Sequence, residues 1–321
     1  MSVERPPKPL VVAHRGASLE QPENTIEAFE AAIDAGADAV EFDLRMTADG
    51  HAVVMHDPDV SRTTEGHGLV SELTLEEIRK LGVPTAEEAL RCLSGRAAAD
   101  IEIKNLPGEP GFTADREPAV EATLDALDAV TFPGQVIVSS FNPASIAHSR
   151  RLRPDVPTGL LTSYDVDADD ALRRATANGH PWILPFVLKV LEADDGFGDR
   201  VHAGGALLGV WIADDPGTAR RLFELGADAV ATNDPRAIAP IRDAAHRPRI
   251  CVDFAKWDRH GRLKLTTVGA REDIARLPNE IYDGMKIIGY DDMLIVEATV
   301  RYNSEENYWV AEFDRDAIRE A

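Results

Sequence analysis

The sequence predicts an α/β protein, a (β/α)₈ or TIM barrel, followed by a small α+β domain with an antiparallel sheet. The first observation is that eight short apolar runs alternate with helical patterns over roughly 235 residues, the length and repeat of such a barrel. The second is that helical crossovers between short strands are typical of a parallel sheet. An open, doubly wound sheet is the alternative, but its first strand usually leads into a glycine-rich phosphate loop. Residues 14–16, His-Arg-Gly, do not fit that loop.

Each unit pairs a run rich in Val, Ile and Leu with a segment whose apolar residues recur at helical spacing. Gly36, Gly179 and Gly226 stand where a left-handed residue closes the last turn of a helix. The expected strands lie within residues 9–16, 38–46, 98–105, 135–141, 157–163, 182–187, 206–213 and 228–234. The expected helices lie within residues 25–36, 85–93, 118–130, 143–152, 167–179, 188–195, 217–226 and 235–245.

The pattern changes after residue 245, so we expect a barrel over residues 1–245 and a small α+β domain over residues 246–321. Residues 254–269 predict a hairpin that turns at Arg259-His260-Gly261. A short helix and three further strand patterns follow it. This C-terminal domain carries no metal-spaced His or Cys cluster. Its expected roles are contact with a second copy or another partner, or cover for the cleft, and the sequence does not decide between them.

The net charge of −22 comes from 34 basic and 56 acidic residues. Residues 246–321 hold 12 basic and 15 acidic residues, a net of −3, so residues 1–245 hold 22 and 41, a net of −19. Such a surface should repel nucleic acid and anionic membranes. A phosphate ligand therefore requires a local cationic pocket or a metal ion.

The chain contains no run of 18 or more apolar residues, so no transmembrane helix is expected. Its first residues lack the apolar core of a signal peptide. The two cysteines, Cys92 and Cys251, are far apart in sequence and indicate no disulfide framework. The simplest expectation is a cytoplasmic protein.

Three carboxylates interrupt the apolar strands near their carboxyl ends, where a (β/α)₈ barrel carries its active site. Glu41 and Asp43 alternate on one strand and so share a face, and Glu102 lies on the next barrel strand. Three buried carboxylates would repel one another unless a cation lay between them. Their hard oxygen atoms suit Mg²⁺, Ca²⁺ or Mn²⁺ better than zinc.

Two histidines and two cations occupy neighbouring strand ends. His14 and Arg15 end the first strand, His56 follows a short apolar run, and Lys104 follows the third barrel strand. Histidines can act as general acid and general base near neutral pH, and arginine can hold a phosphate with two hydrogen bonds. The combination predicts phosphoester chemistry. The structural alternative is that Arg15 and Lys104 only pair with the buried carboxylates.

A set of motifs, in order, resembles the glycerophosphodiester phosphodiesterase family from about residue 10 to residue 238. The resemblance implies a (β/α)₈ fold and hydrolysis of a small-molecule glycerophosphodiester to sn-glycerol 3-phosphate and an alcohol. The motifs are HRG at 14–16, PENT at 22–25, EFDLRMTADG at 41–50, HDPDVSRTTEGHG at 56–68, LTLEEIRKL at 73–81, IEIK at 101–104 and SSF at 139–141.

The resemblance also implies roles for particular residues. The divalent ion, Mg²⁺ or Ca²⁺ with Mn²⁺ as a further option, would be held by the three carboxylates. The acid–base pair would be His14 and His56, without an assignment of acid and base to either. The remaining implied roles are Glu41, Asp43 and Glu102 as metal ligands, Arg15 and Lys104 as phosphate contacts, and Phe141 and Trp211 as aromatic residues of the substrate cleft.

Glu23 and Asn24, in the loop after the first strand, are expected to support the site. Glu23 would orient His14 or Arg15, and the structural alternative for Asn24 is a cap on the following helix. Phe141 and Trp211 have plain core packing as their alternative.

The chain departs from the family's motifs at two strand ends. Asp214 stands where the family often has Asn in Trp-x-x-Asn, and Asn233 follows Thr232 where the family usually has Thr-Asp. We expect both departures to lie away from the catalytic set and to affect only the pocket for the glycerol or alcohol end of the substrate.

The sequence is compatible with three other functions. A lysophospholipase D acting on lipid-like diesters would have the same site. A phosphoinositide-cleaving phosphodiesterase on a similar barrel would use two histidines without a metal, against which the three carboxylates argue. A non-catalytic protein that binds glycerophosphodiesters would keep the pocket, with the C-terminal domain as its output.

Overall fold

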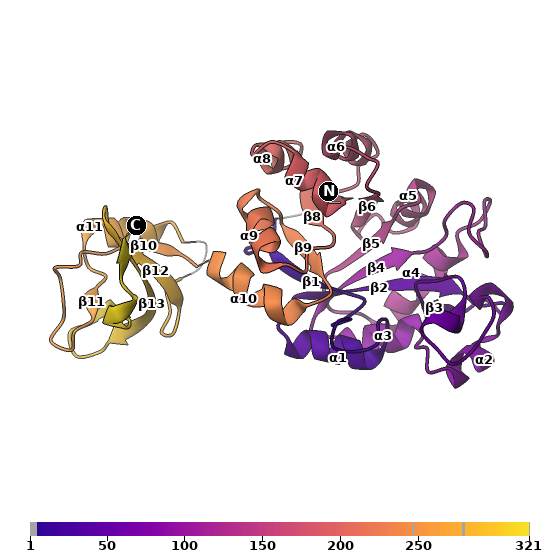
Figure 1. Ribbon diagram of the computed structural model, residues 1–321, viewed down its shortest axis with the longest axis horizontal. Helices are drawn as coiled ribbons and strands as arrows, with labels where there is room; N and C mark the ends of the chain where they lie inside the picture. Colours follow the sequence, from indigo (N-terminus) through magenta and orange to yellow (C-terminus); the bar gives the residue numbers. More distant parts are fainter. Residues whose placement is uncertain (1–4, 246, 278–279, 321) are drawn as a thin grey trace. The chain divides into compact units, whose positions relative to one another are not determined.

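The computed structural model describes residues 5–245, 247–277 and 280–320. The chain folds as two compact units, Met1–Ala245 and His246–Ala321, which Figure 1 shows in indigo to orange and in orange to yellow. No helix in the described part of the chain is long and apolar enough to cross a membrane.

The first unit is a closed barrel of eight parallel strands, as the sequence predicts. Strand β1 pairs with β9 on one side and with β2 on the other, which closes the sheet. The short strand β3 is antiparallel to β2 and lies outside the ring. The strands are β1 (Leu10–His14), β2 (Ala39–Met46), β3 (Ala52–Val54), β4 (Ala98–Ile103), β5 (Val136–Ser140), β6 (Thr158–Thr162), β7 (Trp182–Pro185), β8 (Leu207–Val210) and β9 (Ala229–Thr232).

Helices surround the strands of this barrel (Figure 1). Two of them, α2 and α3, begin at capping boxes, in which a threonine and a glutamate three residues later satisfy each other's backbone N–H groups. The helices are α1 (Ile26–Asp34), α2 (Leu75–Lys80), α3 (Ala86–Leu93), α4 (Pro118–Val130), α5 (Pro143–Leu152), α6 (Ala168–Ala177), α7 (Val187–Glu192), α8 (Phe197–Ala203), α9 (Pro216–Glu224) and α10 (Pro235–Ala245).

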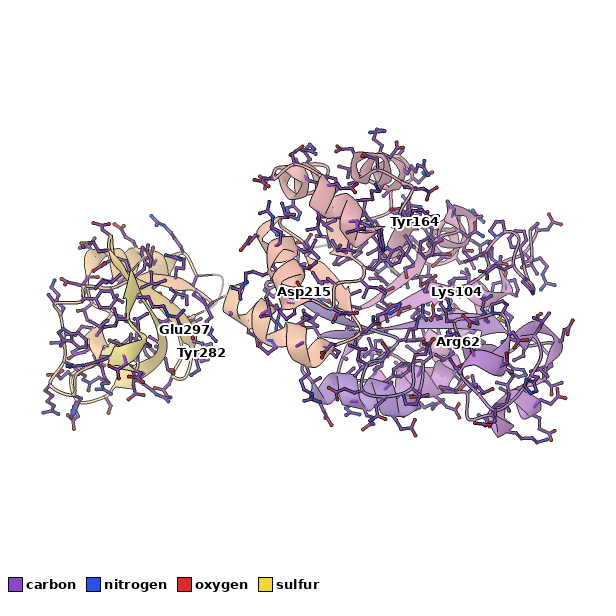
Figure 2. All side chains as sticks on the ribbon, in the orientation of Figure 1. Arg62, Lys104, Tyr164, Asp215, Tyr282 and Glu297 are labelled. Carbon is purple, nitrogen blue, oxygen red and sulfur yellow. The ribbon has the colours of Figure 1, made fainter. Side chains whose placement is uncertain are left out.

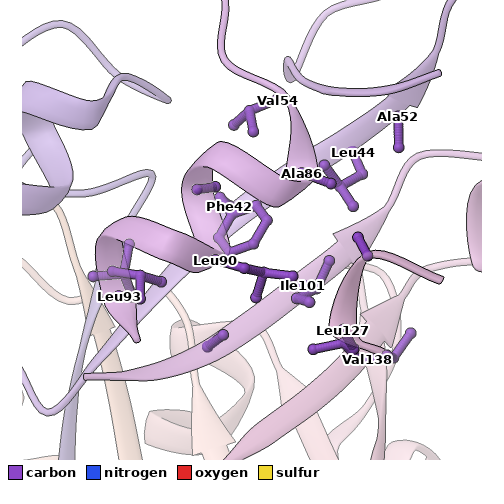
Figure 3. Close-up of a cluster of buried hydrophobic side chains, with 14 of the residues drawn as sticks. Phe42, Leu44, Ala52, Val54, Ala86, Leu90, Leu93, Ile101, Leu127 and Val138 are labelled. Atoms are coloured by element: carbon purple, nitrogen blue, oxygen red, sulfur yellow. The ribbon is translucent and has the colours of Figure 1, made fainter. Parts of the chain in front are cut away.

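The layer between the helices and the sheet is an apolar core that consists of two main clusters of buried side chains. Figure 3 shows Phe42 of β2 and Ile101 of β4 packed against Leu90 and Leu93 of α3. All four side chains are fully buried. Alternate residues of β2 and β4 face this layer, which turns the residues between them, including Glu41, Asp43 and Glu102, toward the barrel interior.

The turn after β1 requires a glycine. Gly16 has φ 83°, and a Cβ at this position would lie 2.6 Å from the carbonyl carbon of Ala28. Arg15 adopts the left-handed region too, at φ 57°, which is uncommon outside glycine. Its backbone N–H lies 2.9 Å from both the carbonyl oxygen and Oε2 of Glu41. The His-Arg-Gly motif is therefore a tight turn that sets the first strand end against the second.

The second unit contains the predicted antiparallel sheet, with one parallel pair in it. Strands β10 and β12 are parallel, and the other pairings are antiparallel. The predicted turn at residues 259–261 lies between Trp257 and Leu263, which pair as an antiparallel β-bridge. The elements are β10 (Arg249–Cys251), β11 (Leu263–Lys264), α11 (Val268–Ala275), β12 (Lys286–Tyr290), β13 (Leu294–Asn303), β14 (Tyr308–Glu312) and β15 (Arg319–Glu320).

Candidate active site

The carboxyl ends of β1, β2 and β4 bring the charged strand residues side by side. The strand register places His14 beside Glu41, and Asp43 beside Glu102. One carboxylate oxygen from each of Glu41, Asp43 and Glu102 lies within 4.8 Å of the other two. All three side chains are buried. This is the spacing of a cluster that can hold one metal ion.

The carboxylate of Glu41 has too few positively charged or hydrogen-bonding neighbours to stabilise its ionised form. Burial, and then the neighbouring carboxylate of Asp43, raise the pKa of Glu41 well above its ordinary value. Burial likewise raises the pKa of Glu102 to about 7. Within the described structure, Oε1 of Glu41 is buried without a hydrogen-bond partner. A divalent cation would satisfy this oxygen and favour the ionised form of both carboxylates, so the donor set fits a hard metal ion.

Lys104 and Arg15 reach the same carboxylates. Lys104 Nζ lies 2.6 Å from Glu102 Oε1 and 3.0 Å from Asp43 Oδ1, and Arg15 Nε lies 3.2 Å from Asp43 Oδ2. Burial alone would raise the pKa of Asp43, but Lys104 and Arg15 outweigh it and hold the pKa below its ordinary value. Arg15 and Lys104 therefore do pair with the buried carboxylates, as the structural alternative expects. Their two positive charges do not neutralise the three negative charges of the cluster.

Asp57 holds His56. The Nδ1 atom of His56 lies 2.6 Å from Asp57 Oδ1, and the other oxygen of Asp57 accepts from Arg62. Asp57 precedes Pro58 in the sequence, where nothing marks it as a partner of the histidine, and sequence reasoning missed this contact. Burial lowers the pKa of His56 from its ordinary value.

Glu23 links the two sides of the site. It accepts a hydrogen bond of 2.9 Å from Arg15 Nη1 and two more, of 2.7 and 2.9 Å, from Arg62. Arg62 is the last residue of a short 3₁₀ helix (Val60–Arg62) that follows β3, and it is labelled in Figure 2 together with Lys104. Sequence reasoning singled out Glu23 but missed Arg62, whose contact with Glu23 joins loops 39 residues apart.

Asn24 contacts the carboxylate cluster and does not cap the helix. Its Nδ2 donates to Asp43 Oδ2 at 2.8 Å, and its backbone has φ 59°. Thr25 is the residue whose side chain accepts from the first turn of α1. The capping alternative for Asn24 is therefore wrong, because the left-handed turn points its amide into the barrel.

Asn233 contacts His14, which corrects the expectation that the two motif departures lie away from the catalytic set. Its Oδ1 lies 2.7 Å from His14 Nδ1, and its Nδ2 donates to Asp214 Oδ2 at 2.8 Å. Burial, and then Arg15, lower the pKa of His14 to about 4. The unusual residues at both strand ends thus form one chain of contacts that ends on a histidine.

Aromatic side chains form the wall of the cavity beside Lys104. The ring of Trp211 makes edge contacts with Phe141 and Phe186, at centroid distances of 5.3 and 5.2 Å. Lys104 Nζ lies 5.9 Å from the centroid of Phe141. Phe186 is not among the residues that line the cavity and supports the wall only through its contact with Trp211. The cavity has a volume of about 820 Å³ and is lined by residues that include His14, Arg15, Glu41, His56, Glu102, Lys104, Phe141 and Trp211.

The model of the glycerophosphoryl diester phosphodiesterase family matches residues 14–237. A glycerophosphodiester phosphodiesterase of Caldanaerobacter subterraneus is 34% identical over 246 residues, which are 72% of this chain and 96% of the relative. One of Bacillus subtilis is 33% identical, over 72% of this chain and 85% of the relative.

A solved structure of a phosphodiesterase from Oleispira antarctica, in complex with the product sn-glycerol-3-phosphate, superimposes with a TM-score of 0.65. It is 26% identical to this chain, over 74% of this chain and 97% of that one. The fold, the acidic cluster and these likenesses define the class, a phosphodiesterase on a (β/α)₈ barrel. The chain belongs to the glycerophosphoryl diester phosphodiesterase family, and its activity is the hydrolysis of glycerophosphodiesters. The C-terminal domain lies outside the matched region.

Proposed function

We propose that the protein hydrolyses glycerophosphodiesters to sn-glycerol 3-phosphate and an alcohol with a divalent metal ion and two histidines. The observation that carries this proposal is the cluster of Glu41, Asp43 and Glu102 within 4.8 Å, next to two histidines. Turnover of glycerophosphocholine, with glycerol 3-phosphate and choline identified as products, tests the reaction.

The three carboxylates would hold the metal, which is Mg²⁺ or Ca²⁺, with Mn²⁺ as a third candidate. When bound, the ion supplies a Lewis acid for a phosphate oxygen. The protein's own cations add to this charge. Arg15 offers its guanidinium and Lys104 its ammonium to the remaining phosphate oxygens, which stabilises the negative charge that develops there.

The histidines differ in their partners, and we propose their roles from this difference. His56 is held by the carboxylate of Asp57, which stabilises a positively charged ring, so His56 is the general acid that protonates the leaving alcohol. His14 is held by the neutral amide of Asn233, so it is the general base that takes the proton of the attacking hydroxyl. That hydroxyl belongs either to a water molecule or to the 2-hydroxyl group of the glycerol, the latter giving a cyclic phosphate first. Phe141 and Trp211 would face the glycerol or alcohol end.

The pKa of Glu102 gives a pH-dependent test of metal binding. Because its pKa is raised to about 7 in the folded protein, the metal-free protein loses stability as the pH rises through that value. A metal ion displaces the proton and recovers this stability. We expect the same concentration of Ca²⁺ or Mg²⁺ to raise Tm more at about pH 8 than at about pH 6. An equal rise at both pH values, measured by thermal unfolding, would contradict metal binding at these carboxylates.

We also propose that residues 1–245 and 246–321 are separate domains and that catalysis belongs to the first. Each unit has its own buried core, and every site residue named above precedes residue 245. The chain truncated after Ala245 should therefore fold and keep its turnover number within about threefold. Gel filtration of both forms tests whether the C-terminal domain makes an oligomer contact. Loss of activity in a folded truncation would show that this domain takes part in catalysis.

We also propose that the protein is located in the cytoplasm. Both cysteines, Cys92 and Cys251, are free thiols, which fits a reducing cytoplasm. The partner that the site supports is a small-molecule glycerophosphodiester.

A further inference from the structure

A chain of three polar groups runs from the end of β8 to the catalytic cavity. Asp214 Oδ1 accepts from Thr232 Oγ1 at 2.9 Å and from the backbone N–H of Asn233 at 2.6 Å. Asp214 Oδ2 accepts from Asn233 Nδ2 at 2.8 Å. Oδ1 of Asn233 then lies 2.7 Å from Nδ1 of His14. Three donors therefore fix the carboxylate, and the carboxylate fixes the amide.

The direction of each hydrogen bond follows from what each group can do. An ionised carboxylate only accepts, so the group that Asn233 turns toward Asp214 must be its NH₂. Its carbonyl oxygen then faces His14, and a carbonyl oxygen also only accepts. His14 Nδ1 must therefore carry a hydrogen. Ser18 Oγ, 2.9 Å from the same carbonyl oxygen, is a donor that is compatible with this direction.

The hydrogen on Nδ1 decides the state of the other nitrogen. A neutral imidazole has one N–H and one lone pair, so the lone pair lies on Nε2. Nε2 is the atom that faces the carboxylate cluster, 4.0 Å from Glu41 Oε2. With the opposite tautomer, Nε2 would carry the hydrogen and could not accept a proton from an attacking hydroxyl.

We infer that Asp214 and Asn233 act as a positioning pair that holds His14 in the Nδ1–H tautomer and so keeps Nε2 ready to accept a proton. Neither residue touches the reacting atoms; both act through His14. His56 is held differently, because its ring contacts the carboxylate of Asp57 directly, without an amide between them. The inference rests on the proposed function only for the use of Nε2 as a base, whereas the tautomer itself is a property of the folded protein.

The tautomer is measured directly by NMR of the ¹⁵N-labelled full-length protein, with His14 assigned by its loss in His14→Gln. We expect the ring of His14 to have its hydrogen on Nδ1 at neutral pH in the wild type. A hydrogen on Nε2 would overturn the inference, whether or not the protein turns over any substrate. Absence of turnover in the wild type with every metal would instead overturn the proposed function.

Two variants test the pair through catalysis. Asn233→Leu removes the amide at similar volume, and we expect kcat to fall by about 10²-fold with KM within about threefold, because loss of orientation affects the base more than substrate binding. Asp214→Asn no longer fixes the side-chain amide of Asn233, which can then flip and present its NH₂ group to His14. We expect this variant to lower kcat by about 10-fold. In both variants the NMR signal of His14 should show a mixture of tautomers.

A double variant that exchanges Asp214 and Asn233 distinguishes a positioning role of the pair from a general effect on the folded structure. The double variant Asp214→Asn with Asn233→Asp keeps an acceptor facing His14 and a donor–acceptor contact behind it. We expect it to recover kcat to within about fivefold of the wild type. A double variant whose kcat is no higher than that of Asp214→Asn alone would contradict the inference. An Asn233→Leu enzyme with kcat within about twofold of the wild type would contradict it as well.

Asp234→Asn is the matched control, with the same chemical change one residue from Asn233. Asp234 Oδ1 caps α10 by accepting from the N–H of Ala237 at 3.0 Å, and asparagine caps a helix equally well. A second control is Asp215→Asn. Asp215 is next to Asp214 in the sequence, caps α9 and is labelled in Figure 2. Neither change should alter kcat or the tautomer of His14. A loss in either control as large as that in Asn233→Leu would overturn the positioning role, because the effect would then belong to the strand end as a whole.

Discussion

Replacement of His14 or His56 by alanine should lower turnover of glycerophosphocholine by roughly 10²–10⁴-fold, the range for loss of a general acid or base. Each ring presents one nitrogen to the cavity and has the other held, by Asn233 for His14 and by Asp57 for His56. Steady-state kinetics of both variants, with folding checked by circular dichroism, measures the effect.

The two histidines have a common control. His180 is also buried in the barrel unit, and its Nδ1 lies 2.8 Å from Thr158 Oγ1, at the amino end of β6 and away from the catalytic strand ends. The His180→Ala enzyme should keep its turnover, provided that it folds. If either the His14→Ala or the His56→Ala enzyme stays within about tenfold of the wild type, that histidine does not have the proposed role.

Replacement of Glu41 by glutamine should have the second large effect. Glutamine keeps the size of the side chain and an acceptor for the backbone N–H of Arg15, but it removes the charge that a cation would bind. Changes to groups that only support metal ligands cost about 10- to 100-fold in affinity or activity, so loss of a ligand should cost more than roughly 10²-fold at a fixed metal concentration. The rise of Tm with metal should shrink together with activity.

The same substitution should not destabilise the metal-free protein. The pKa of Glu41 is raised well above its ordinary value, so its charge is disfavoured in the fold and its removal relieves repulsion with Asp43. Glu117→Gln is the matched control, since Glu117 is also buried but contacts Asn105 and Ser145. A Glu41→Gln enzyme with unchanged metal dependence would remove Glu41 from the ligand set.

The strand ends could be read from the sequence because alternation and topology are local rules. Glu41 and Asp43 must share a face, and the carboxyl ends of neighbouring parallel strands must meet. These two rules predict that Glu41, Asp43 and Glu102 lie together, and in the structure one oxygen of each lies within 4.8 Å of the others. The same rules placed His14 and Arg15 at the end of β1.

The residues that hold the histidines could not be found this way. Asn233 reaches His14 across 219 residues of sequence, and only closure of the barrel through the pairing of β1 with β9 makes them neighbours. For Asn24 the sequence leaves a helix cap open as the alternative to a supporting role, because the residue type alone does not predict the left-handed backbone that turns its amide onto Asp43. Local patterns predict which residues are charged in the barrel, whereas the partners of those charges depend on tertiary geometry.

The most direct measurement is the release of glycerol 3-phosphate from glycerophosphocholine and glycerophosphoethanolamine by the full-length protein. The protein is first treated with EDTA, and Mg²⁺, Ca²⁺ or Mn²⁺ is then restored in separate samples. The account predicts no release after chelation and recovery with at least one of the three ions. Full release in the presence of EDTA would contradict it, because the cluster of Glu41, Asp43 and Glu102 would then have no part in catalysis as a metal site.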